Sequence, residues 1–269
     1  MSATIFKHEF TARLKSVLIW AIAMVLLLFF FFSLYPGFSS QVATINELMK
    51  SYPPQLLEAF GMANLDLSTL LGFFSLVWSF VMLCLAIQAG NYGFGLVSVE
   101  ETELTADFLM TKPVSRLQVI NSKLLAAICS LLVTDAIVYI ATVLFILIFK
   151  GDHTYETTPL VLVLVSLMLF QLFFLSVGLV VSLILKRIRS VTPYGLGLAF
   201  AAYIINGFSG ILGEVKLEYI TPFKHFDAAY IIAHASYNTP LVILNVAVSL
   251  VALAVSYWLY LHKDIHAVS

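Results

Sequence analysis

Six long apolar runs constrain what this chain can fold into more than any motif does. A helix needs about 20 apolar residues to cross the roughly 30 Å of hydrocarbon in a bilayer. The runs are continuously apolar, whereas the strands of a membrane barrel are about 10 residues long and alternate in character. We therefore predict an all-α, polytopic membrane protein with a single transmembrane domain over residues 1–269. The expected spans are 17–35, 70–96, 121–149, 159–185, 193–212 and 240–261.

The composition excludes the other broad classes of protein. Of the 269 residues, 61% are hydrophobic and only 11% are charged, where soluble domains average about 25% charged. A formal net charge of −1 gives no basic excess that would favour nucleic acid as a partner. Cys84 and Cys129 lie inside apolar runs without zinc or disulfide spacing, so we expect them to pack as small hydrophobic residues.

The distribution of Lys and Arg predicts the orientation in the membrane. Ten of the 14 lie on the side of both termini and four on the other side, and cytoplasmic loops carry the excess of positive charge. Lys123, at the start of the third predicted span, is counted with the side of the termini. Both termini are therefore expected in the cytoplasm, and an even number of spans agrees with that.

Two segments outside the spans have the character of interfacial structure. Phe6, Phe10, Leu14 and Val17 recur at helical spacing among basic residues, which favours an amphipathic N-terminal helix along the inner leaflet. The alternative is a simple extension of the first span. On the outer side, residues 219–235 contain an apolar stretch too short to cross, which favours a helix that lies in the interface or dips in and returns.

The inner loop between the second and third spans predicts a short helix over about residues 99–111. Ser98 and Glu101 have capping-box spacing, which places the start of this helix. Pro113 ends it. Ser115 and Gln118 repeat the capping pattern and begin the helix that enters the third span.

This inner helix has two different faces. Glu100, Glu103 and Asp107 share an acidic face, while Leu104 and Phe108 form an apolar knob on another. Charge runs usually mark solvated faces, so an exposed linker helix and a docking helix are both compatible with the pattern.

The chain carries no recognisable catalytic or cofactor-binding motif. No G-x-x-x-x-G-K-[ST] sequence occurs, so nucleotide binding through a P-loop is excluded. Zincin and nucleophile-elbow patterns are also missing, and we predict neither an enzyme nor a cofactor or metal site. Close helix packing is the better explanation for the glycines at 90, 93, 95, 207, 210 and 213.

Asp135 is the one acidic residue within a predicted span. A carboxylate near the centre of a span costs about 2.5–3.5 kcal/mol on insertion scales and usually faces the interior of a bundle. We expect it to face the interior of the bundle or an interface with a partner chain rather than lipid. Gln88, Asn91, Gln171 and Asn206 are uncharged polar candidates for the same interior, where they would line any path through the bundle.

The topology together with the inner loop resembles the type-2 ATP-binding-cassette (ABC) permeases. In that family this loop reads like E-x-E-x-G-T-L-E-x-L-L-x-x-P-V-S-R. Leu104 replaces the usual Gly, and Ala106 replaces Leu. The positions that match, with Asp107 in place of Glu, are Glu101, Glu103, Thr105, Asp107, Leu109, Pro113, Val114, Ser115 and Arg116.

The resemblance implies that the inner helix is a coupling helix, seated in a groove of a separate ATPase subunit. Two ATPases and two permeases would form the complex, the second permease being another copy or a paralogue. The implied docking residues are Glu100, Glu103, Leu104, Asp107, Phe108 and Arg116.

On this reading the chain is the membrane subunit of an exporter in a prokaryotic plasma membrane. An amphiphilic substrate such as an antimicrobial peptide, drug or lipid-like molecule fits the apolar spans, with aromatic runs at 29–32 and 73–74 as candidate walls. Export of sodium or carbohydrate by the same architecture stays open. So do an ion-coupled transporter or channel that uses Asp135, and a membrane anchor or sensor.

Overall fold

The computed structural model describes residues 2–53, 57, 69–103, 114–185, 188–211 and 216–262, and of 43, 46, 49–50, 99–103 and 210–211 the helical backbone alone. Regular structure in these residues is helical. The long helices are α1 (Ala3–Ser40), α4 (Leu70–Glu103), α6 (Arg116–Phe149), α7 (Thr157–Ile184), α8 (Thr192–Ile211) and α11 (Thr239–His262). The short ones are α2 (Val42–Lys50), η1 (Leu217–Tyr219), α9 (Pro222–His225) and α10 (Ala228–His234).

Five of the described helices are long and apolar enough to cross a membrane, namely α1, α4 as far as Ser98, α6, α7 and α11. The chain is therefore a multi-pass membrane protein. Helix α8 lies where another span was predicted, and its 20 residues reach about 30 Å, the minimum for crossing. It is not among the five, so a total of six spans stays a prediction.

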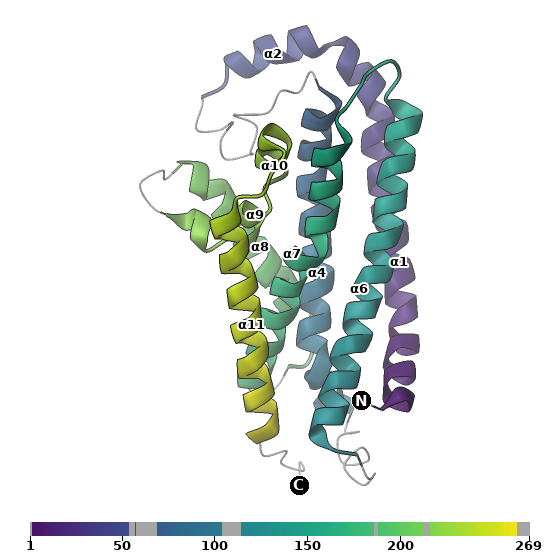
Figure 1. Cartoon of the computed structure of the whole chain (residues 1–269), viewed down its shortest axis with the longest axis vertical. Helices are drawn as coiled ribbons and strands as arrows, with labels where there is room; N and C mark the ends of the chain where they lie inside the picture. The colour runs from purple at the N-terminus through teal and green to yellow at the C-terminus, as the bar shows by residue number, and fades with distance from the viewer. Residues whose placement is uncertain are drawn as a thin grey trace.

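The long helices run alternately in opposite directions (Figure 1), and α1 begins at the same end of the bundle at which α11 ends. We call this the termini end and the opposite one, where α2 lies, the far end. Helix α1 packs chiefly on α6, whereas α4 packs on α7 and α8, and α7 also packs on α11. Direct packing between the α1–α6 pair and the α4–α7 pair is sparser, and we call this boundary the seam.

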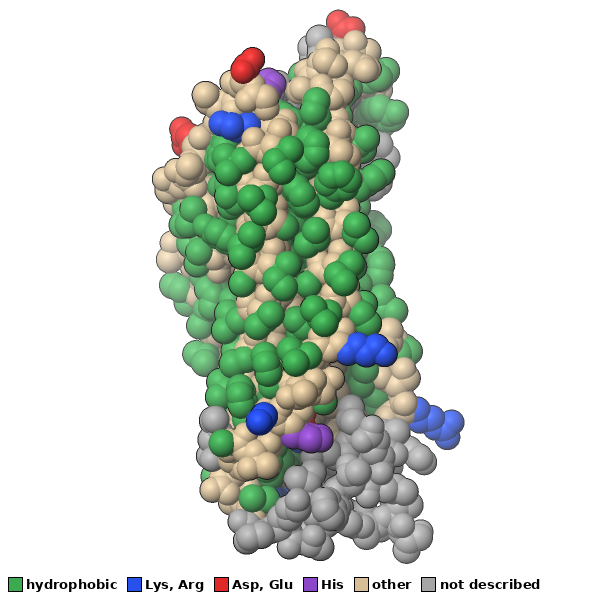
Figure 2. All heavy atoms as spheres, turned by 90° about the vertical axis from the view of Figure 1, so that its right-hand side faces the viewer, with side chains coloured by type: hydrophobic (Ala, Val, Ile, Leu, Met, Phe, Trp, Pro, Cys, Tyr) green, Lys and Arg blue, Asp and Glu red, His purple; other side chains and the backbone are tan. Residues whose placement is uncertain are grey.

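Apolar side chains cover the outside of the bundle. Leu18 and Ile22 of α1 and Ile140 and Ile148 of α6 are each more than half exposed. Figure 2 shows the side of the molecule on which these two helices lie, with charged side chains towards the two ends and hydrophobic ones between them. An exposed apolar belt of this kind matches the hydrocarbon of a bilayer.

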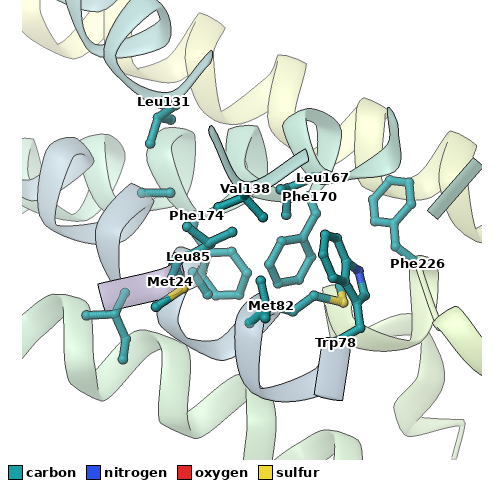
Figure 3. Packing of buried hydrophobic residues seen from close by; sticks show 14 of the residues in the cluster. Met24, Trp78, Met82, Leu85, Leu131, Val138, Leu167, Phe170, Phe174 and Phe226 are labelled. Atoms are coloured by element: carbon teal, nitrogen blue, oxygen red, sulfur yellow. The ribbon is translucent and has the colours of Figure 1, made fainter. Parts of the chain in front are cut away.

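The centre of the bundle is filled by large apolar side chains. Trp78, Phe74, Phe170 and Phe174 are fully buried, and Figure 3 shows Phe170 and Phe174 between residues of α4 and α6. Since lipid tails are as apolar as these side chains, close packing rather than exclusion of water holds such helices together.

Glycines bring α4 very close to its neighbours, as predicted for Gly90 and Gly93. A Cβ atom on Gly93 would collide with the Leu175 carbonyl of α7, and one on Gly90 would lie 3.3 Å from the Gly195 Cα of α8. Gly178 of α7 completes the contact, because a Cβ there would lie 3.0 Å from the Gly90 carbonyl oxygen. Gly178 and Gly195 were not singled out by sequence.

The N-terminal amphipathic stretch is not a separate interfacial helix. Helix α1 runs without a break over 38 residues, so the alternative reading, an extension of the first span, is correct. The helix also continues past the predicted end at Tyr35 and through Pro36. Tyr35 and Phe38, on either side of the proline, both pack on Phe73, with ring centroids 5.2 and 5.1 Å away. This packing holds together the turns that the proline would otherwise weaken.

Candidate functional site

The predicted coupling helix is only partly visible. Helix α4 continues without interruption to Glu103, and Leu104, Asp107 and Phe108 lie outside the described residues. The prediction that Ser98 caps a new helix is wrong. Its hydroxyl donates to the Phe94 carbonyl oxygen, 2.6 Å away, within α4. A serine can bond to the carbonyl four residues earlier instead of capping, and here the longer helix prevails.

The start of α6 is the capping box that the sequence predicts. The Ser115 hydroxyl accepts from the Gln118 backbone N–H at 3.3 Å, and the Gln118 side-chain oxygen accepts from the Ser115 N–H at 3.1 Å. Arg116, a predicted docking residue, donates from its guanidinium to the Leu261 carbonyl oxygen at 3.3 Å. A cation at this position caps the C-terminal end of α11 and links it to α6.

Lys123 crosses the seam near the termini end. It is 3% exposed, and its ammonium donates to the Leu96 carbonyl oxygen of α4 at 3.0 Å. The same ammonium lies 3.5 Å from a carboxylate oxygen of Glu9 in α1, and Glu9 also pairs with Arg13 at 2.6 Å. Lys123 is thus a buried link between three helices, and it lies within α6 near the end of the bundle with which it was counted.

A second set of polar contacts crosses the seam further into the bundle. The Gln88 amide of α4 donates to the Thr134 hydroxyl of α6 at 2.9 Å and to the Tyr92 hydroxyl at 3.3 Å. Tyr92 in turn donates to the Ser16 hydroxyl of α1 at 3.2 Å. The Arg13 guanidinium lies 5.9 Å from the centroid of the Tyr92 ring, so the two sets of contacts adjoin.

Asp135 follows Thr134 and faces α7. The residue as a whole is partly exposed, but both carboxylate oxygens are buried and form no hydrogen bond of standard geometry within the described residues. The fully buried Gln171 lies within interacting distance, and neither polar atom of its amide forms such a bond either. We call Gln88, Tyr92, Thr134, Asp135 and Gln171 the seam cluster.

The other two predicted path residues lie elsewhere. Asn91 packs against Gly195 of α8, where its side chain fills the space that a Cβ would occupy. Asn206 is 11 residues beyond Gly195, or about 16 Å along α8. The oxygen of each amide is buried without a hydrogen bond among the described residues. The structure therefore joins Gln88, Gln171 and Asp135 at the seam and leaves Asn91 and Asn206 beside or within α8.

The aromatic runs proposed as substrate walls serve packing and lipid contact. Phe32, Phe73 and Phe74 are buried, and the ring of Phe32 lies 6.4 and 6.5 Å from those of Phe73 and Phe74. Phe29 and Phe30 are about half exposed on the outside of α1. The two runs do not form one continuous wall.

Between α8 and α11 the chain forms a compact cap towards the far end. Phe223 of α9 inserts between Phe170, Phe174 and Tyr203, with ring centroids 5.0, 5.9 and 5.4 Å away. The Thr221 hydroxyl donates to the Ala202 carbonyl oxygen at 2.8 Å. These contacts attach the cap to α7 and α8.

A buried histidine joins the same cap to α11. The Nδ1 atom of His225 lies 3.3 Å from the Asn245 amide nitrogen. Burial lowers the pKa of His225 from its ordinary value of 6.5, and the nearby carbonyls of Tyr219 and Glu218 oppose this only in part. The ring is therefore neutral at physiological pH. Among the described residues no three His, Cys, Asp or Glu side chains converge as a metal site.

Comparison with known families decides what this bundle is. The family model described as ABC-2 family transporter protein matches residues 3–265. The chain belongs to the ABC-2 transporter family. No curated protein and no solved structure gives a significant match. The resemblance to type-2 ABC permeases is thus confirmed.

Membership of the ABC-2 family assigns the chain to transport. It is a multi-pass membrane permease of an ABC transporter, and members of the family generally act as transport subunits without a catalytic site of their own. They typically pair with an ABC ATPase. The buried seam cluster and the capped start of α6 are therefore parts of a transport subunit.

Proposed function

We propose that this ABC-2 permease exports an amphiphilic substrate across a prokaryotic plasma membrane, driven by two copies of a separate ATPase. A second permease, a copy or a paralogue, completes the complex, and both termini are cytoplasmic. The family match over residues 3–265, the ten-to-four distribution of basic residues and the absence of a P-loop motif from the sequence support this proposal.

The continuity of α4 carries the proposal. One helix of 34 residues, about 50 Å long, extends from the far end to the edge of the predicted docking segment. The same helix provides Gln88, Tyr92 and the Leu96 carbonyl, which bond to α6 and α1 across the seam. A displacement of the docking segment would therefore act directly on the seam.

The seam is the boundary at which the bundle can change its packing. Sparse direct contact and a few polar bonds hold the two helix pairs together here. Discrete alternative packings of helices are the usual basis of a transport switch, and a force applied by the ATPase would bias one of them. In this scheme the α1–α6 pair moves relative to α4–α7.

Phe108 and Leu104 are the proposed apolar anchors in the ATPase groove. Glu100, Glu103 and Asp107 surround them, where acidic charge steers association more than it adds affinity. Arg116 contributes by linking the start of α6 to Leu261 of α11, which braces the loop that the ATPase would move.

The amphiphilic character of the substrate follows from the low charge of the interior. The seam cluster offers amides, hydroxyls and a single carboxylate. Large apolar side chains of α4, α6 and α7 fill the core of the bundle (Figure 3). A hydrophilic ion or sugar would need more fixed polar ligands.

The test is reconstitution of the chain in liposomes with an ABC ATPase from the same organism. The proposal predicts ATP hydrolysis that is stimulated by cationic peptides or lipid-like drugs, with ATP-dependent movement of the stimulating compound. Transport driven by an ion gradient without the ATPase would instead identify a secondary transporter that uses Asp135. Stimulation by sodium or carbohydrate alone would overturn the substrate class but not the ATP-driven mechanism.

A further inference from the structure

Asp135 and Gln171 face each other, and the polar atoms of both side chains lack standard hydrogen bonds among the described residues. Both carboxylate oxygens of Asp135 and both polar atoms of the Gln171 amide are buried without a standard hydrogen bond among the described residues. The two side chains lie within interacting distance of each other, on α6 and α7. A buried carboxyl and a buried amide that face each other need a reason to be there.

Among the residues that the structure describes, no basic side chain bonds to the Asp135 carboxylate. Helix α7 has no ionisable residue, and α6 has no other charged residue between Lys123 and its last residue, Phe149. On α4 the titratable groups before Ser98 are Cys84 and Tyr92. Helix α1 has no titratable side chain from Ser16 to Phe32.

Along α6 the charged residue closest to Asp135 in sequence is Lys123, which contacts Glu9 of α1. Lys123 is 12 residues from Asp135, or about 18 Å along α6. Val138, three residues after Asp135 on α6, packs with Leu167 and Phe170 of α7 (Figure 3).

One proton on Asp135 would allow both side chains to form hydrogen bonds with each other. A protonated carboxylic acid has one O–H donor and one carbonyl acceptor, and an amide has the complementary acceptor and donor. The Asp135 O–H would donate to the Gln171 side-chain oxygen, and the Gln171 N–H would donate to the other Asp135 oxygen. An ionised Asp135 would leave the Gln171 oxygen without a donor and an unpaired charge in an apolar interior, which is costly.

We propose that Asp135 and Gln171 form a proton-binding site in the transmembrane region. The proton is held while α6 packs on α7 and is released to water when the seam opens. In the release step the Asp135 O–H bond breaks, water accepts the proton, and the carboxylate remains on Asp135. Thr134, the preceding residue, bonds to Gln88 across the seam, so the site lies at the boundary that moves.

Infrared spectroscopy of the purified full-length chain, without any ATPase, tests the binding half of this proposal. At neutral pH the wild-type chain should show the carbonyl absorption of one protonated carboxylic acid that Asp135→Asn lacks. Gln171→Leu should shift this band, and Gln41→Leu, a change at an exposed amide on the far end, should not. Carbon-13 labelling of aspartate assigns the band if Asp135→Asn fails to fold.

Two results would overturn proton binding. One is a folded wild-type chain in which the Asp135 carboxyl is ionised at neutral pH. The other is a band that disappears when sodium chloride replaces potassium chloride, since that would identify a metal-cation site. Proton release is tested separately in the ATPase complex, where Asp135→Asn should assemble but lose ATP-driven transport at least tenfold. Full transport by this variant would refute release.

Discussion

The buried ammonium of Lys123 donates a hydrogen bond to the Leu96 carbonyl oxygen, 3.0 Å away, and so fastens α6 to α4 at the termini end. Glu9 of α1 lies 3.5 Å from the same ammonium. One side chain thus joins both helices of the α1–α6 pair to α4. Together with the Gln88–Thr134 bond, it defines where the two halves of the bundle are held together.

Replacing Lys123 by Met should destabilise the bundle by about 2 kcal/mol, because hydrogen bonds to charged groups contribute about 1.5–3 kcal/mol. Glu9 keeps its ion pair with Arg13 in this variant. The loss of stability should therefore be smaller than for a buried charge that has no partner. Thermal unfolding in detergent measures it. Lys15→Met, at an exposed position of α1, is the control, and an equal midpoint for both variants would contradict the role of Lys123.

Substituting Ala for Gly93 should force α4 away from α7, because the new Cβ would collide with the Leu175 carbonyl. Overpacking of this kind typically costs about 1–3 kcal/mol. Gly197→Ala is the matched control, since a Cβ there meets nothing within 4 Å. Chemical denaturation in mixed micelles should separate the two variants, and a Gly93→Ala chain as stable as Gly197→Ala would show that the contact is not tight.

Breaking the Gln88–Thr134 bond should impair switching more than folding. Gln88→Leu and Thr134→Val should each lower ATP-driven transport severalfold, and the double variant should be little worse than Gln88→Leu, because both changes remove the same Gln88–Thr134 bond. ATP hydrolysis should continue, uncoupled from transport. Additive losses would indicate that the two residues act separately.

His225 should make the far-end cap sensitive to acid. Its pKa is lowered by burial from 6.5, so the unfolded chain binds more protons than the folded chain as pH falls through about 6.5, and stability is lost in that direction. The unfolding midpoint of the wild-type chain should therefore fall relative to that of His225→Gln when the pH is lowered from 8 to 5. His8→Gln, a change at an exposed position, should follow the wild-type chain over the same pH range.

The helices themselves were predictable because the bilayer imposes a length and an apolar composition that can be read locally. The capping box at Ser115 and the close approach at Gly93 were predictable for the same reason, since each depends on a short pattern or a residue type. Ser98 shows the limit of this reasoning. Its sequence has the spacing of a capping box, but α4 continues through this position and the Ser98 hydroxyl bonds to the Phe94 carbonyl oxygen instead.

The seam could not be predicted, because its contacts join residues that are distant in the chain. Lys123 reads only as a basic residue on the side of the termini until Glu9 and the Leu96 carbonyl are placed beside it. Gln88 and Thr134 are individually ordinary residues whose meaning comes from pairing across 46 positions. Phe223 was visible only as one aromatic residue among 22 Phe, and its insertion between α7 and α8 depends on the whole bundle.

Co-purification with an ABC ATPase from the same organism tests most directly the claim that the segment after α4 couples this permease to ATP. The wild-type chain should retain the ATPase, and Phe108→Ala with Leu104→Ala should lose it at least tenfold, because buried apolar anchors dominate interface affinity. Leu48→Ala, at an exposed position of α2 on the far end, should retain it fully. Retention of the ATPase and of ATP-driven transport by the Phe108 and Leu104 double variant would contradict the account.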